Sequence, residues 1–213
     1  RGCLLTFFDS SKNKVKLYEP EIAPNQLALH YYTVEDTREG WVDSLKVLLE
    51  SYFLPNQTSV VFNYSEIREV GLRLKTFGGL SSGSKPLEEL HDKVSAVLNR
   101  DISNNNKRLS GTGIADIFNL IGKTVVSGNI RRTAIILFGD KDDEEFLNLK
   151  NYEKNPHRAD YSWTSNNSIF AELGMNYSNV EERIKENGEP GLAWLENMRK
   201  YSRMCDPPDW KDK

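Results

Sequence analysis

The chain has 213 residues, of which 38% are hydrophobic and 28% are charged, and its formal net charge is -3 at pH 7. This composition predicts a soluble globular protein with an ordinary core, in one large domain or two small ones. The slight acidic excess argues against a general nucleic-acid-binding protein, which normally carries a clustered basic surface. No apolar run approaches the roughly 18 residues that a transmembrane helix needs, so no membrane span is expected.

The sequence contains two cysteines, Cys3 and Cys205, which are far apart and form no CxxC pair. They indicate neither a disulfide framework nor a metal site, and a reducing compartment, with the cytoplasm favoured, is expected. The chain begins Arg1-Gly2 without an initiator methionine or a signal peptide, and its last residues complete no element. We interpret it as a fragment or a processed chain.

Residues 1–34 alternate short apolar runs with polar turns, which predicts edge strands or irregular structure. A helix follows, because Asp36-Thr37-Arg38-Glu39 fits a capping box in which Asp36 accepts from first-turn amides and Glu39 reaches back. The helix is predicted to end before Pro55, and residues 60–62 to form a short buried strand. The apolar face of this helix comprises Trp41, Leu45, Leu48, Leu49 and Tyr52.

Residues 75–86 hold three glycines, three serines and two lysines directly before a predicted helix. A glycine- and serine-rich loop that leads into a helix N-terminus offers amides, hydroxyls and the positive end of the helix dipole, which suit a phosphate. Pro86 occupies the expected first helical position, and the spacing is not that of a Walker loop. A flexible surface turn is the alternative. The helix is predicted to leave His91 at the surface and to bury Leu87, Leu90, Val94, Val97 and Leu98.

A further helix runs into the polar loop at 127–132, and a strand is predicted at 133–138. The loop carries two adjacent arginines beside Gly128, and Arg suits planar, bidentate capture of phosphate or carboxylate. Ordinary surface arginines are the alternative. The predicted apolar face of the helix comprises Ile114, Ile117, Phe118, Ile121 and Val125.

The last third of the chain is predicted to continue with a short helix, a strand and a helix. The acidic run at 140–145 favours the dipole of a helix that starts there over a metal site. Residues 163–170 are predicted to form a strand whose asparagines need partners if buried. A turn at 187–191 closes the helix around residues 180–184. This order of elements predicts an α/β fold with helices outside a sheet.

No catalytic constellation is evident, because the three histidines lie in unrelated contexts and no set of Ser, His and Asp is recognisable. Five blocks nevertheless resemble, in the family's order, the adenosylcobalamin-dependent (class II) ribonucleoside-triphosphate reductases of the monomeric, thioredoxin-linked subgroup. One such block is weak evidence, whereas five in register are specific. The blocks are Asp-Thr-Arg-Glu-Gly-Trp at 36–41, Phe-Gly-Gly-Leu-Ser-Ser-Gly at 77–83, Asn-Leu-Ile-Gly-Lys-Thr-Val-Val-Ser-Gly-Asn-Ile-Arg-Arg at 119–132, Ser-Asn-Asn-Ser at 165–168 and Glu-Asn-Gly-Glu-Pro-Gly at 186–191.

The resemblance implies part of a ten-stranded α/β reductase barrel plus part of a helical effector-binding insertion. Residues 1–70 resemble the latter part of the insertion, and 71–213 the early part of the barrel. The allosteric deoxynucleotide would bind with its ribose on Asp36, and two loops would carry its identity to the substrate base. The implied effector-binding residues are Asp36, Lys75, Ser81, Ser82, Gly83 and Ser84; the implied specificity loop comprises Ser127, Gly128, Asn129, Arg131 and Arg132.

The departures from the family concern its chemistry. The family needs a radical-forming cysteine on a finger loop and a pair of reducing cysteines, and none of these motifs occurs in the 213 residues. We assign no role to Cys3 or Cys205, and therefore no catalytic residue and no metal ligand. The cobalamin-contacting part is also missing, so this chain is not expected to bind the adenosylcobalamin of the full-length enzyme.

Two functions follow from these observations. The first is a portion of a working reductase that binds nucleotides, uses thioredoxin as the full-length enzyme does, and is completed by another polypeptide or by the missing remainder. The second is a non-catalytic structural or interaction subunit, derived from such a reductase, within a larger assembly. An unrelated phosphate-loop protein is a third reading, but it lacks the Lys and Ser or Thr placement that such a loop needs.

Overall fold

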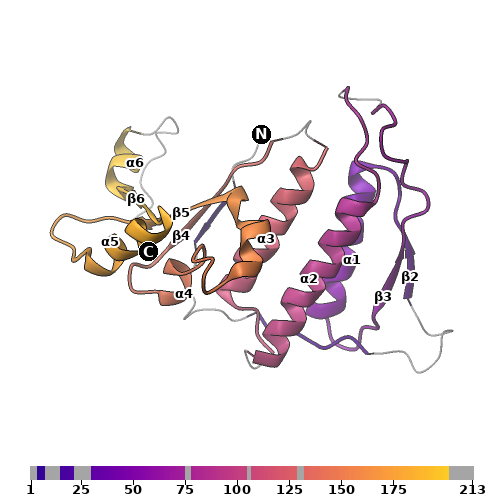
Figure 1. Ribbon diagram of the computed structural model, residues 1–213. Helices are drawn as coiled ribbons and strands as arrows, with labels where there is room; N and C mark the ends of the chain where they lie inside the picture. The colour runs from indigo at the N-terminus through magenta and orange to yellow at the C-terminus, as the bar shows by residue number, and fades with distance from the viewer. Residues whose placement is uncertain are drawn as a thin grey trace. The chain divides into compact units, whose positions relative to one another are not determined.

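The computed structural model describes residues 4–7, 15–21, 30–74, 78–104, 107–128 and 132–201 (Figure 1). The chain falls into two compact units, which we call the helical unit (10–134) and the sheet unit (1–9 with 135–213). The domain division expected near residue 70 lies inside the helical unit and stays a prediction. Cys3 and Cys205 lie outside the described residues.

The helical unit contains three long helices, with α2 (Lys85–Asn104) between α1 (Arg38–Phe53) and α3 (Gly111–Val126) (Figure 1). α2 begins one residue before Pro86, close to the predicted start. Its predicted apolar face is confirmed, because all five residues of that face are buried in contact with the neighbouring helices: Leu87, Leu90, Val94, Val97 and Leu98.

The start of α1 differs from the predicted capping box. Thr37, and not Asp36, caps the helix, since its hydroxyl accepts from the amide of Gly40 at 2.8 Å. Glu39 is exposed and pairs with Arg38. The capping prediction for Asp36 was wrong because its carboxylate is engaged by a guanidinium from a distant segment. Gly40 permits this tight start, because a Cβ there would lie 2.6 Å from the backbone oxygen of Glu35.

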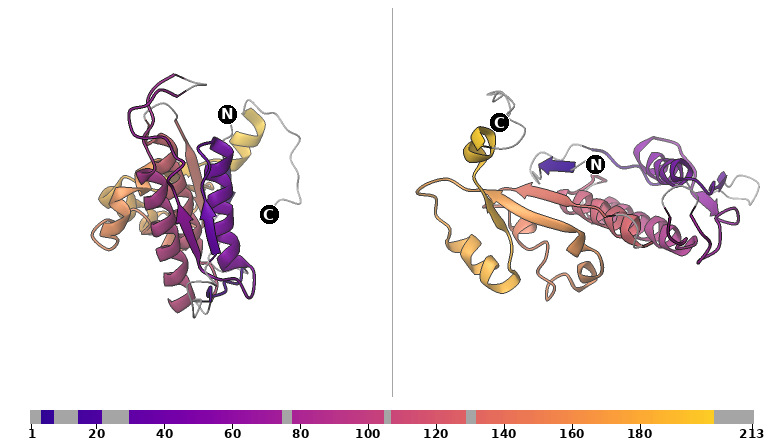
Figure 2. Two further views of the ribbon diagram at one scale, coloured as in Figure 1. Left: turned by 90° about the vertical axis from the view of Figure 1, so that its right-hand side faces the viewer. Right: turned by 90° about the horizontal axis from the view of Figure 1, so that it is seen from above.

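β2 (His30–Thr33) and β3 (Val60–Asn63) form a two-stranded parallel sheet in the helical unit, against one side of α1 and α2 (Figure 2). The strand predicted at 60–62 exists, but it is not fully buried: Val61 is 38% exposed. Only one face of this small sheet can pack on helices, so alternate side chains face solvent.

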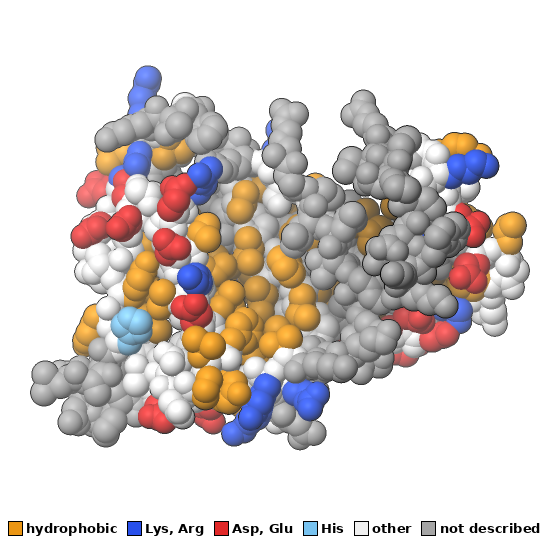
Figure 3. Space-filling view, turned by 180° about the vertical axis from the view of Figure 1, so that it is seen from behind, with side chains coloured by type: hydrophobic (Ala, Val, Ile, Leu, Met, Phe, Trp, Pro, Cys, Tyr) orange, Lys and Arg blue, Asp and Glu red, His pale blue; other side chains and the backbone are white. Residues whose placement is uncertain are grey.

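α3 buries a different face from the predicted one. Ile117 is buried, but Ile114, Phe118 and Ile121 are half-buried, and Val125 is 38% exposed. Its buried side includes polar groups, above all Asp116, which receives a 3.0 Å hydrogen bond from Arg100 of α2. Periodicity of apolar residues cannot reveal such a paired carboxylate. Seen from behind, hydrophobic side chains gather over the helical unit (Figure 3).

The sheet unit is built on four parallel strands in the order β1-β4-β5-β6 (Figure 1). They are β1 (Leu4–Phe7), β4 (Ile135–Gly139), β5 (Ser165–Phe170) and β6 (Gly191–Ala193). Phe138 of β4 stacks on Phe170 of β5 with ring centroids 4.7 Å apart. Asn167 is buried and its side-chain oxygen accepts from Ser165 at 3.1 Å, which meets the predicted need for a partner.

Short helices connect the strands of the sheet unit. α4 (Glu144–Leu147) starts where the acidic run predicted a helix, with Asp143 accepting from the amide of Phe146. Two 3-10 helices, η3 (Pro156–Asp160) and η4 (Ser162–Thr164), precede β5, so the predicted strand begins two residues later than expected. α5 (Ser178–Asn187) ends at Gly188, whose φ of 74° favours glycine, and α6 (Leu195–Tyr201) follows β6.

Candidate functional site

The carboxylate of Asp36 is held by Arg68. The Nε of Arg68 donates to Oδ2 of Asp36 at 2.5 Å, and Nη2 lies 3.5 Å from the backbone oxygen of the same residue. The side chains are only 23% and 30% exposed, for Arg68 and Asp36 respectively. A charge-assisted bond in a partly buried setting is stronger than a surface ion pair. Nothing in the sequence around Asp36 pointed to Arg68, because it lies on another segment.

The glycine- and serine-rich loop is one limb of a small hairpin rather than a simple turn. The amide of Ser81 donates to the backbone oxygen of Leu72 at 2.7 Å, and Leu74 donates to Gly79 at 3.0 Å. The hydroxyl of Ser81 accepts from the amide of Gly83 at 3.0 Å and donates to the backbone oxygen of Arg68 at 3.4 Å. Ser81 is therefore linked to the Asp36–Arg68 pair. Lys75 lies outside the described residues.

The loop then enters α2 through Gly83 and Ser84. Gly83 has a φ of 71°, a conformation that a residue with a side chain would adopt only with strain. The backbone oxygen of Ser84 accepts from the amides of Leu87 and Glu88, so Ser84 occupies the capping position of α2. Ser82 and Ser84 are half-buried. The first turn of α2 thus follows the loop directly, and its role as an anion-binding end stays a prediction.

The C-terminal end of α3 lies beside the N-terminal end of α2. The hydroxyl of Thr124 donates to the backbone oxygen of Pro86 at 3.4 Å. Lys123 also pairs with Glu89 at 2.8 Å, and the hydrogen bonds from Lys123 and Lys93 lower the pKa of that carboxyl. The segment that carries the predicted specificity loop therefore leaves α3 next to the start of α2.

The specificity loop is described only in part. Ser127 caps α3, with its hydroxyl donating to the backbone oxygen of Thr124 at 2.8 Å, and Gly128 follows in a turn. Arg132 is exposed. Asn129 and Arg131 lie outside the described residues. The structure brings the start of this loop to the end of the helix layer where Ser81–Ser84 lie.

His91 was predicted to be a surface residue, and this prediction was wrong. It is only 3% exposed. Its Nδ1 lies 2.8 Å from the hydroxyl of Tyr64 and its Nε2 lies 3.2 Å from Oγ of Ser44. A sequence signal existed, since His91 falls four residues after Leu87 and three before Val94, which is the spacing of one helix face. These contacts tie α1, α2 and the segment after β3 together.

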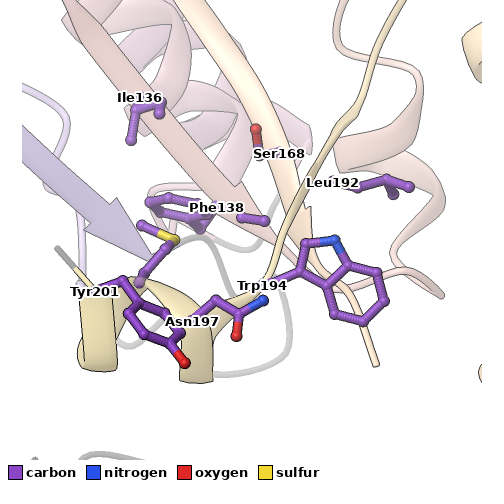
Figure 4. A pocket seen from close by; sticks show the side chains of 9 residues that line it. Ile136, Phe138, Ser168, Leu192, Trp194, Asn197 and Tyr201 are labelled. Atoms are coloured by element: carbon purple, nitrogen blue, oxygen red, sulfur yellow. The ribbon is translucent and has the colours of Figure 1, made fainter. Parts of the chain in front are cut away.

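The sheet unit has a hollow of about 510 Å³ beside β4, β5, β6 and α6. Figure 4 shows Phe138 on the sheet side, and Trp194, Asn197 and Tyr201 from the segment that follows β6. The described residues of the lining are mostly apolar and none of them is charged: Ile136, Phe138, Ser168, Leu192, Ala193, Trp194, Asn197, Met198 and Tyr201. The polar groups among these described residues are two hydroxyls, one amide and one indole.

Comparison with known proteins gives a consistent picture. Residues 10–98 match the family model described as the insertion domain of B12-dependent ribonucleotide reductase. The chain is 54% identical over 183 residues to a probable adenosylcobalamin-dependent ribonucleoside-triphosphate reductase of Dictyostelium discoideum, and 54% identical over 181 residues to the adenosylcobalamin-dependent ribonucleoside-triphosphate reductase of Euglena gracilis. Each alignment covers 85% of this chain and 24% of the relative.

A solved structure agrees with these matches. The crystal structure of a B12-dependent (class II) ribonucleotide reductase superposes with a TM-score of 0.68 at 34% identity, over 87% of this chain and 25% of that one. This confirms the predicted fold class, an α/β chain with part of a reductase barrel and part of its insertion. The chain belongs to the ribonucleotide reductases. More narrowly, it is part of the B12-dependent class II branch and spans about a quarter of the length of the relatives it matches.

The cofactor named for these relatives is adenosylcobalamin. The described lining of the hollow in the sheet unit is a poor match for it, because mostly apolar side chains offer few hydrogen bonds to the amide-rich rim of a corrin. We assign the cofactor to none of the residues described. No helix in the described ranges combines the length and the apolar character that crossing a membrane requires.

Proposed function

We propose that this chain carries the allosteric specificity site of a ribonucleoside-triphosphate reductase, where a deoxynucleoside triphosphate binds. The enzyme as a whole would reduce ribonucleoside triphosphates by a radical mechanism, with adenosylcobalamin as cofactor and thioredoxin as reductant. The residues of this chain would supply binding and communication, not bond cleavage. The alternative is a non-catalytic subunit that keeps the fold without the effector.

One observation carries the proposal: the Asp36–Arg68 pair is joined through Ser81 to the loop that opens α2. A carboxylate can accept from a ribose hydroxyl, while a guanidinium and a helix N-terminus suit the phosphates. Among the described residues, the hydrogen bonds of the Asp36 carboxylate use Oδ2. Oδ1 is then the oxygen to which a ligand hydroxyl would donate.

The two loops at this end of the helix layer have separate roles in the proposal. Ser81, Ser82, Gly83 and Ser84 would contact the effector, together with Lys75. The specificity loop from Ser127 to Arg132 would respond to the effector's base and shift at the substrate side. The contact between Thr124 and Pro86 supports this arrangement, because it holds the roots of both loops together.

Isothermal titration with the four deoxynucleoside triphosphates tests the proposal. The unmutated chain should bind at least one of them, and Asp36→Asn should weaken that binding by about 1.5–3 kcal/mol, the value of a hydrogen bond to a charged group. Asp43→Asn, which changes an exposed carboxylate of α1, is the matched control and should bind normally. Absence of binding by the unmutated chain at millimolar ligand would favour the non-catalytic subunit.

A further inference from the structure

Buried His91 lies in a chain of hydrogen bonds whose direction is fixed by the hydroxyl protons. Ser44 donates its one hydroxyl proton to the backbone oxygen of Trp41 at 2.8 Å. Toward Nε2 of His91, 3.2 Å away, Ser44 can therefore only accept. Nε2 then carries the imidazole proton, and the bare Nδ1 accepts from the hydroxyl of Tyr64 at 2.8 Å.

The imidazole of His91 and the phenol of Tyr64 are both held in their neutral forms. Burial lowers the pKa of His91 to about 4, so the imidazole is uncharged at neutral pH. Burial, followed by the charges of Asp92 and Glu88, raises the pKa of Tyr64, so the phenol keeps the proton that it donates. The imidazole also packs on Phe62 with ring centroids 4.2 Å apart. Position and tautomer of His91 are both determined by these neighbours.

Tyr64 begins the short turn that leads to Arg68. The amide of Ile67, a buried residue, donates to the backbone oxygen of Tyr64 at 3.0 Å, and Arg68 follows directly. On the other side of Tyr64, the backbone oxygen of Asn63 accepts from the amide of Val34 at 2.9 Å, two residues before Asp36. The segment from Asn63 to Arg68 therefore connects the strand end that precedes Asp36 to the turn that carries its guanidinium partner.

We propose that His91 is a positioning residue of the effector site: its hydrogen bonds to Ser44 and Tyr64 anchor the turn that presents Arg68 to Asp36. The effect on a ligand rests on the proposed function, whereas the effect on the Asp36–Arg68 pair does not. His91 acts through Tyr64 and Arg68. A fully apolar residue at position 91 would leave the Tyr64 hydroxyl and Ser44 without these partners, at a cost to the order of the turn.

Three variants separate hydrogen bonding from packing. His91→Phe keeps an aromatic ring against Phe62 but has no donor or acceptor. His91→Gln offers an amide NH₂ that can donate and a carbonyl oxygen that can accept, and is the conservative rescue. Val97→Ala is the matched control, because it removes buried volume from the same helix and takes no part in these hydrogen bonds.

The first readout needs no ligand. NMR of the chain labelled with ¹⁵N in histidine and arginine should show the Nε2-protonated tautomer for His91 and a slowly exchanging Nε proton for Arg68. His91→Phe should accelerate exchange of that proton by about tenfold, the equivalent of one lost hydrogen bond, while His91→Gln and Val97→Ala preserve it. The opposite tautomer, or unchanged exchange in His91→Phe, overturns the proposal.

The second readout is titration with the deoxynucleoside triphosphates, below the melting temperature of every variant. His91→Phe should bind about five- to tenfold more weakly than the unmutated chain. His91→Gln and Val97→Ala should bind nearly as tightly as the unmutated chain. Combining His91→Phe with Tyr64→Phe should add little, because both remove the same link. Equal affinity of His91→Phe and the unmutated chain refutes the positioning role. If the unmutated chain binds no deoxynucleotide, the proposed function fails. The exchange of the Arg68 Nε proton then tests by itself whether His91 positions Arg68.

Discussion

Asp36 and Arg68 stand 32 residues apart in the sequence and form a half-buried ion pair with an Nε–Oδ2 distance of 2.5 Å. The pair joins the start of α1 to the hairpin that precedes α2. It also explains why Thr37 caps α1 in place of Asp36. A ligand hydroxyl that binds Asp36 would meet a carboxylate already oriented by Arg68, so little ordering of that side chain accompanies binding.

Stability should fall in mild acid because of His91. Its pKa is about 4 in the folded chain, against 6.5 for an unperturbed histidine, so the unfolded state takes up a proton first. The contribution is fully present above about pH 6.5 and is lost progressively as the pH falls toward 4; the total loss by that pH is about 3 kcal/mol. Urea unfolding at pH 7.5 and pH 5 measures it.

The matched comparison for this pH effect is His91→Gln, which cannot titrate. The unfolding free energy of the unmutated chain minus that of His91→Gln should fall as the pH is lowered from 7.5 to 5. Other charged groups near the cluster, including Asp92, Glu88 and Asp43, are present in both proteins, so their effects on stability cancel in the difference. A difference that does not vary between pH 7.5 and 5 contradicts the prediction.

The buried carboxylate of Asp116 should be important for joining α2 and α3. It is 1% exposed and accepts from Arg100, whose guanidinium also pairs with Asp101. Asp116→Asn removes one of the two carboxylates that pair with Arg100 and leaves Asp101, so we expect the loss of one charge-assisted hydrogen bond, about 1.5–3 kcal/mol in unfolding free energy. Asp92→Asn, on the exposed side of α2, should change it by less than about 0.5 kcal/mol. Denaturant titration measures the unfolding free energy of both variants. Similar unfolding midpoints for Asp116→Asn and Asp92→Asn would show that the Asp116–Arg100 pair contributes nothing to stability.

Arg131 is predicted to contact the effector or to transmit its identity. Arg131→Ala should weaken deoxynucleotide binding by about 1.5–3 kcal/mol, because a guanidinium makes charge-assisted hydrogen bonds to phosphate or base. Arg38→Ala, which removes an exposed arginine that pairs with Glu39, serves as the control. Calorimetric titration compares the two, and equal affinities would exclude a role for Arg131 in binding.

The chain by itself should form no deoxynucleotide. Its two cysteines are fewer than the three that the family's radical mechanism requires, and neither lies in the radical-site motif. The assay combines the purified chain with a ribonucleoside triphosphate, adenosylcobalamin and a dithiol, and follows the product by chromatography. A product that depends on the chain would disprove this prediction.

Several elements could be predicted from local sequence because local rules decide them. Apolar residues spaced three and four apart set the buried face of α2, Asp143 starts α4, and Gly188 ends α5. β4 and β5 followed from short apolar or β-favouring runs, with errors of a few residues at their starts. Five ordered sequence blocks were specific enough to indicate the reductase family, which the comparisons confirm.

The candidate site could be predicted only in outline. The sequence indicated that Asp36 and the serine loop belong to it, but neither Arg68 nor His91 was recognised. Both lie on segments whose local patterns are ordinary, and their roles arise from contacts made across the fold. The position of Ser81 beside the backbone oxygen of Arg68 likewise follows from the hairpin, which no local rule predicted.

The sequence by itself determined the family and most of the helices, and it predicted the residues that would bind an anion. Only the tertiary structure decided which polar groups are buried and with what partner: Asp36 with Arg68, His91 between Ser44 and Tyr64, and Asp116 with Arg100. The physical reason is that helical periodicity reports apolar area along one segment. A buried polar group is instead stabilised by a hydrogen-bond partner from another segment, and its energy depends on geometry that the segment alone does not contain.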